Sequence, residues 1–113
     1  MYTSPDTVAF APLGPTVSFL AATPTPPTAA QATTNTGETP SGVYRVVNSG
    51  AVTVFLGVGT SSALAVTAAS TLATSIPLLP GAVEVIRFAP NLYFTGLSAS
   101  STATVYVTQG IGI

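Results

Sequence analysis

The sequence predicts an all-β fold, an antiparallel sandwich or barrel, and three observations lead to it. Short runs of β-branched and aromatic residues recur every 8–12 residues in the second half of the chain, with turn-forming residues between them. The clearest run alternates strictly, with Ala103, Val105 and Val107 on one face and threonine and tyrosine on the other. Apolar residues almost nowhere recur at helical spacing, and Pro, Gly and Thr occur throughout.

The 113 residues suffice for a single domain, in which composition distinguishes three parts. Residues 1–15 lack periodicity and are expected to form an extended N-terminal arm. Residues 16–42 hold a first strand, predicted at Thr16–Ala21 by its alternation, and then a segment rich in Thr, Pro and Ala. That segment is either a loop or linker, or it contains a short edge strand near Ala29–Thr34, because edge strands tolerate nearby prolines. Residues 43–113 are expected to form the main body of the sandwich.

A hairpin is predicted at the start of this main body. Val43–Asn48 is an apolar, β-branched run, and the cluster Asn48-Ser49-Gly50 after it is typical of a tight turn. The next run, Val52–Val58, alternates with a period of two, as a returning strand does. Gly57 and Gly59 indicate a bulge or close packing against a neighbouring element.

The remaining elements are predicted from alternation and turn chemistry. The alanine-rich segment Ser61–Thr74 is the one candidate helix, although its Ser, Thr and Val content disfavours it. Pro80-Gly81 fits the central positions of a type II turn. Strands are then expected at 83–88, 92–97 and 103–108, with turns at Pro90-Asn91 and Ser98–Ser101.

Charged side chains are almost missing from the chain, at 4% of residues against about 25% in ordinary soluble proteins. The cations are Arg45 and Arg87, and the sequence contains no Lys, His, Cys or Trp. This excludes imidazole bases, thiol nucleophiles, zinc fingers and disulfides. Two cations are also too few for binding a nucleic-acid backbone, so no nucleic-acid partner is expected. Thr and Ser are plentiful instead, and hydroxyls hydrate a surface without repelling a neighbour, which suits a subunit packed in an array.

No catalytic, cofactor-binding or metal-binding residue is predicted. The carboxylates Asp6, Glu38 and Glu84 are scattered along the chain, whereas a glycosidase pair or a calcium site needs clustered oxygens. Serine nucleophiles would lack a histidine or lysine base, so the chain is expected not to be an enzyme. No membrane partner is expected, because the longest apolar stretch, Ala51–Gly59, is far shorter than a span of about 20 residues. No basic leader precedes Arg45, so no secretory signal is predicted.

A few side chains are candidates for structural or binding roles. Arg45 and Glu84 are predicted to form an ion pair, across strands or between subunits. Tyr93 and Phe94 point to opposite faces of one strand, so one is expected in the core. The other is an interface anchor, an exposed sugar-stacking platform, or a locally packed surface ring. The candidate interface residues are Tyr2, Phe10, Leu13, Tyr93 and Phe94.

Three segments of the second half resemble small structural proteins of tailed bacteriophages. They are VYRVVNSG at 43–50, LPGAVEVIR at 79–87 and ATVYVTQG at 103–110. The best match is the capsid decoration, or cement, group, and the resemblance covers roughly residues 43–110. These are strand and turn motifs without catalytic residues, so no site is carried over. The resemblance implies a jelly-roll-like β-sandwich.

The resemblance also implies a function. Members of the group bind the outside of the phage head and bridge neighbouring major capsid subunits, which stabilises the shell. The chain is therefore expected to be a virion protein made in the bacterial host cytoplasm, with the major capsid protein as partner and a dimer or trimer as its own state. Its near-neutral charge of −1 suits the outer surface rather than the DNA-facing one. The alternatives are a carbohydrate- or receptor-binding head-fibre or tail module, and a tail or head–tail structural component.

Overall fold

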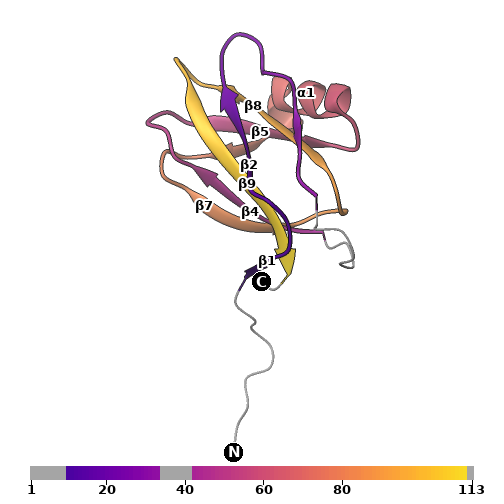
Figure 1. The fold of residues 1–113 in the computed structure, drawn as a ribbon. Coiled ribbons are helices and arrows are strands. Elements are labelled where there is room, and N and C mark those ends of the chain that lie inside the picture. Colours follow the sequence, from indigo (N-terminus) through magenta and orange to yellow (C-terminus); the bar gives the residue numbers. More distant parts are fainter. Residues whose placement is uncertain (1–9, 34–41, 112–113) are drawn as a thin grey trace, which may run out of the picture.

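The computed structural model describes residues 10–33 and 42–111, which form two β-sheets packed face to face (Figure 1). Every pairing between named strands is antiparallel. Sheet A contains β1 (Ala11–Pro12), β2 (Val17–Ala21), β4 (Val43–Asn48), β7 (Val83–Arg87) and β9 (Ala103–Ile111). Sheet B contains β3 (Ala30–Gln31), β5 (Val54–Gly59), β6 (Ile76–Leu78) and β8 (Tyr93–Ser98).

The order of the strands gives the sandwich its topology. In sheet A the strand order is β2-β9-β4-β7. The short β1 also pairs with β9, at its C-terminal end and on the same side as β2. In sheet B the order is β3-β8-β5-β6. The chain crosses from one sheet to the other at every connection between β2 and β9 except β5 to β6. Leaving aside the two-residue β1, strands β2 to β9 form two four-stranded sheets joined by such crossings, which is the arrangement of a jelly-roll sandwich. The predicted all-β, jelly-roll-like fold is therefore confirmed.

The predicted hairpin across residues 43–58 is wrong. Val43–Asn48 and Val54–Gly59 are strands, but β4 pairs with β7 and β9, whereas β5 pairs with β6 and β8. The turn at Asn48-Ser49-Gly50 instead carries the chain from one sheet to the other, so that both strands bury one side in the shared core. The segments at 83–88 and 92–97 are likewise strands of opposite sheets.

Two elements of the less regular first half are also formed. The strand predicted at Thr16–Ala21 is β2, which pairs with β9 from Val17 to Ala21. Within the Thr/Pro/Ala-rich segment, β3 forms a two-residue edge strand on β8, as the edge-strand alternative predicted. Residues 34–41 lie outside the described part of the chain.

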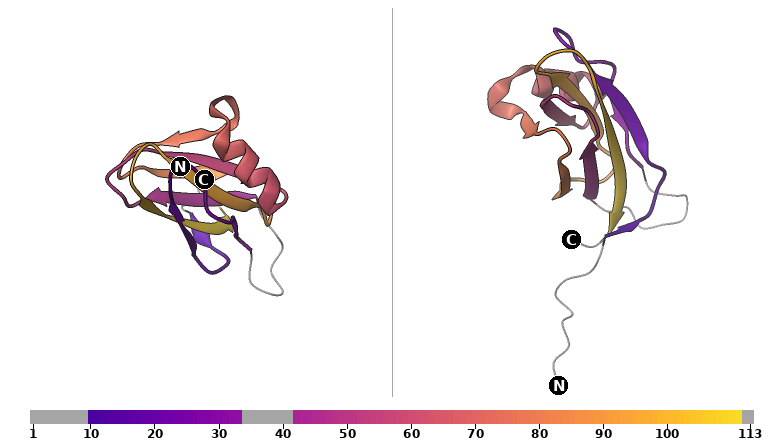
Figure 2. Two further views of the ribbon diagram at one scale, coloured as in Figure 1. Left: turned by 90° about the horizontal axis from the view of Figure 1, so that it is seen from above. Right: turned by 90° about the vertical axis from the view of Figure 1, so that its left-hand side faces the viewer.

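The alanine-rich segment forms a helix after all, and two glycines explain where it packs. α1 (Ser62–Ser70) begins after Ser61, whose Oγ accepts a hydrogen bond from the Leu64 N–H at 3.2 Å, and the 3₁₀ turn η1 (Leu72–Thr74) follows. A side chain at Gly57 or Gly59 would collide with the helix backbone, so these glycines let α1 lie directly on sheet B. Figure 2 shows α1 on the side of the sandwich away from β2 and β9.

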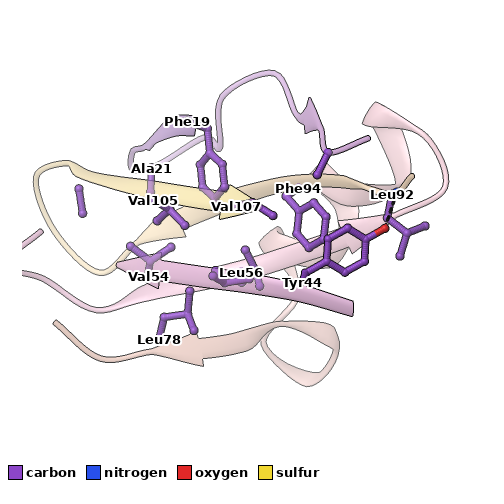
Figure 3. Close-up of a cluster of buried hydrophobic side chains, with 13 residues drawn as sticks. Phe19, Ala21, Tyr44, Val54, Leu56, Leu78, Leu92, Phe94, Val105 and Val107 are labelled. Carbon is purple, nitrogen blue, oxygen red and sulfur yellow. Dashed lines mark hydrogen bonds between the residues drawn. The ribbon is translucent and has the colours of Figure 1, made fainter. Parts of the chain in front are cut away.

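The core lies between the two sheets (Figure 3). At one end, the fully buried rings of Tyr44 and Phe94 meet edge to face, with centroids 4.7 Å apart. The Tyr44 hydroxyl donates to the Ala89 carbonyl oxygen at 2.7 Å and accepts from the Leu92 N–H at 3.0 Å. Burial raises the pKa of this phenol, and the backbone contacts oppose the rise only in part. Tyr44 thus ties β4 to the connection between β7 and β8.

The last residues of the predicted arm belong to the folded body. Ala11 and Pro12 pair with the end of β9, and the Leu13 N–H donates to the Gln109 carbonyl oxygen at 2.9 Å. The Phe10 ring occupies the space beside Gly110, where a Cβ would lie 2.5 Å from Phe10 Cζ. Residues 1–9 lie outside the described part of the chain, so the arm is traced only where it joins β9.

Candidate interaction surface

The outer side of sheet A presents a broad surface that no described helix or strand covers, which we call the open face. Along β2, β9, β4 and β7, core residues alternate with residues that point away from sheet B. In Figure 2 the helical layer lies beyond sheet B, and no described helix or strand packs over the outer side of sheet A. The residues of the open face are Ser18, Leu20, Arg45, Val47, Val83, Val85, Arg87, Thr104 and Tyr106. Thr108 points to the same side but is buried.

Strand register arranges this face in rows that cross the sheet. Ser18 lies opposite Tyr106, Tyr106 opposite Val47, and Val47 opposite Val83, which makes one continuous row over four strands. Tyr106 is 43% exposed and Val83 is 51% exposed, so both side chains offer apolar surface to a partner. Leu20, 52% exposed, flanks the row on β2. The result is a shallow aliphatic and aromatic band bordered by hydroxyl groups.

The next row carries charge. Arg45 lies between Thr108 on β9 and Val85 on β7, and both of its strand neighbours point to the same open side. Thr108 is held in place by a 2.6 Å hydrogen bond between its Oγ1 and that of Thr16. Arg87 lies opposite Val43, two residues from the Arg45 position. Both arginines are exposed, so the open face has a positive end.

The predicted ion pair between Arg45 and Glu84 is not formed within the described chain. Their strands are neighbours, as expected, but Glu84 lies opposite the buried Val46 and Arg45 lies opposite Val85. Residues one position apart on a strand point to opposite faces, so the two side chains leave the sheet on different sides. Glu84 is nevertheless exposed, because β7 is an edge strand of sheet A. A pairing between subunits stays a prediction.

The predicted interface residues are spread over the molecule. Phe94 is fully buried beside Tyr44, so it is the core member of the Tyr93–Phe94 pair and cannot serve as an interface anchor. Tyr93 is half-buried on the other side of sheet B, opposite Gln31 and Gly59. Phe10 and Leu13, both half-buried, pack at the end of β9. Tyr2 lies outside the described residues.

None of the residues predicted to lie at an interface is among the residues of the open face. Its signal is present in the alternation itself, since Tyr106 is a large aromatic at an outward position of the most regular strand. What the sequence lacks is the strand order, which places Tyr106 between Ser18 and Val47. Those residues are far apart along the chain.

Other kinds of site are not formed by the described residues. Within the ranges 10–33 and 42–111, no pocket is present and no three metal-ligating side chains lie together. None of the helices in these ranges is long and apolar enough to cross a membrane. Comparison with family models, curated proteins and solved structures finds no match.

Proposed function

We propose that this protein is a capsid decoration (cement) protein of a tailed bacteriophage, and that the open face of sheet A attaches it to the outside of the head. The observation that carries the proposal is the face itself, a sheet surface that no described helix or strand covers, with Tyr106, Leu20 and Val83 each about half exposed. In this function the protein stabilises the shell by bridging major capsid subunits, and it performs no chemistry.

The residue types of the open face suit such an attachment. Tyrosine and arginine are among the residues that most often dominate binding energy at protein interfaces, and lysine is depleted there. Aliphatic and hydroxyl side chains around Tyr106 add many weak contacts, which a symmetric shell multiplies over its copies. A net charge of −1 lets many copies crowd together without strong mutual repulsion. A dimer or trimer on the shell would multiply the contacts further.

The experiment is a binding assay with heads of the encoding phage assembled without this protein. The wild-type chain is expected to bind at saturable stoichiometry, and Tyr106→Ala is expected to lower the affinity about tenfold. Leu72→Ala is the matched control, because Leu72 is 76% exposed but lies in η1, next to α1. No saturable binding of the wild-type chain would overturn the proposal.

A carbohydrate-binding module is the second candidate, and Tyr106 is also the observation that favours it. An exposed aromatic ring beside hydroxyl side chains, here Ser18 on the neighbouring strand, is a surface on which a sugar ring stacks. A glycan array separates the two functions. Binding to a defined glycan that is lost in Tyr106→Ala, together with no binding to heads, favours the carbohydrate module.

A further inference from the structure

The only two cations of the chain lie side by side on one surface. Arg45 on β4 is opposite Val85, and Arg87 stands two residues further along β7. This makes the two arginines diagonal neighbours on the same face of adjacent strands, about 7–8 Å apart between their Cα atoms. Both belong to the open face.

Neither guanidinium is neutralised by the described part of the chain. No ion pair or hydrogen bond joins the guanidinium of Arg45 or Arg87 to a residue in the ranges 10–33 and 42–111. Glu84 is the one carboxylate in these ranges, and it projects from the opposite side of the sheet. Two like charges kept close together, with no compensating carboxylate among the described residues, favour an anionic partner.

We infer that Arg45 and Arg87 bind carboxylate groups on an acidic protein surface and so orient the open face on its partner. The inference rests on the proposed attachment through that face and adds the chemistry of the surface it meets. The planar guanidinium donates two parallel hydrogen bonds to a carboxylate, which fixes direction as well as distance. Arg45 and Arg87 would then each bind an Asp or Glu side chain on the partner.

The surroundings of the pair favour protein carboxylates over phosphates. Nucleic acids and anionic lipid surfaces are bound through many cations, and this face offers two. Beside Arg45 lies the row of Tyr106, Val47 and Val83, which matches the apolar centre of a protein interface with charges at its rim. The pair is therefore expected to set register and association rate, while the apolar row supplies contact area.

The first test uses a simple acidic polypeptide and needs no phage. In a ¹⁵N–¹H spectrum only two Nε–Hε signals arise, because the chain has two arginines. Poly-L-glutamate is expected to shift both signals together with amides of β4 and β7, and added salt is expected to reverse the shifts. The inference is overturned if neither signal moves, or if an oligothymidylate of the same length shifts them equally.

The second test returns to the heads assembled without the protein. The double variant Arg45→Gln/Arg87→Gln is expected to bind them roughly 100-fold more weakly than the wild type, and Arg45→Lys/Arg87→Lys is expected to recover only part of the loss. Glu84→Gln is the control, since it removes a charge from the other side of β7. If the wild type binds heads and the double glutamine variant binds equally well, the inference fails while the proposed function stands. If the wild type binds poly-L-glutamate through the arginines but binds no heads, the proposed function fails instead.

Discussion

The side-chain amide of Asn48 donates a hydrogen bond to the Leu78 carbonyl oxygen, 3.0 Å away, and so joins the end of β4 in sheet A to β6 in sheet B. The same Nδ2 also lies 2.9 Å from the Val52 carbonyl oxygen and 3.2 Å from that of Leu79, and Oδ1 accepts from the Gly50 N–H. Asn48 is fully buried, and its side chain fastens the two crossings at this end of the sandwich together.

Replacing this residue is expected to destabilise the fold strongly. Asn48→Ala leaves buried carbonyl oxygens without donors, and the expected loss in the free energy of unfolding is about 3 kcal/mol. Chemical denaturation measures it. Ser49→Ala is the control, because its exposed Oγ bonds to the Thr104 carbonyl oxygen, and its expected cost is below about 0.5 kcal/mol. Similar losses for the two variants would contradict this account of the crossing.

The contact between α1 and sheet B depends on Gly57. A Cβ at this position would lie 2.5 Å from the Ala69 Cβ and closer still to the helix backbone. Gly57→Ala is therefore expected to cost about 2–3 kcal/mol through overpacking. Gly81→Ala separates this effect from backbone strain, since Gly81 has φ +77° and no atom within 4 Å of its Cβ position. Its expected cost is about 1 kcal/mol, and an equal or larger loss there would argue against the clash.

Stability is expected to depend on pH mainly in the alkaline range. Burial raises the pKa of Tyr44 above its ordinary value of 10.0, so the folded state holds this proton more tightly than the unfolded chain does. The resulting stability is fully present below pH 10 and is lost as pH rises through the folded pKa. Thermal melts from pH 7 to 11 measure it.

Tyr44→Phe tests the assignment of that alkaline loss. At neutral pH the variant is expected to lose about 1–2 kcal/mol, because the Ala89 carbonyl oxygen and the Leu92 N–H both lose a partner. Above pH 10 its stability should decline less than that of the wild type. Tyr106→Phe is expected to keep the full alkaline loss, and equal alkaline behaviour of the Tyr44→Phe variant and the wild type would rule out Tyr44 as the cause.

Phe10 is expected to act in folding rather than in binding. Its ring fills the space beside Gly110, so Phe10→Ala should lower the free energy of unfolding by about 1–2 kcal/mol, less than the 3–5 typical of a fully buried phenylalanine. Leu20→Ala is the comparison on the open face, where 52% exposure predicts a cost below about 0.5 kcal/mol. A Phe10→Ala variant with unchanged stability but weaker binding would restore Phe10 as an interface residue.

The strands were predictable from the sequence because their signal is local. Alternation identified β2 and β9 directly, and prolines and glycines marked the boundaries of β7 and β8. The crossing after β4 was not predictable in this way. Asn48-Ser49-Gly50 suits a hairpin, and the bonds that decide otherwise join Asn48 to carbonyl oxygens about 30 residues away.

The helix and the open face show the same limit. Val, Ser and Thr lower the intrinsic helix propensity of 62–70, and packing on the bare surface at Gly57 and Gly59 compensates. The two glycines correctly indicated a close neighbour, but not which one. The grouping of Arg45 with Arg87 depends on the register of β4 against β7, which no local pattern contains.

The most direct test of the central claim is a reconstruction by electron cryo-microscopy of the phage heads after this protein has been added. The account predicts density for the sandwich on the outer shell, with Tyr106 and Arg45 of sheet A against the major capsid protein and α1 facing outward. Density with α1 against the shell, or no added density at saturating protein, would contradict it.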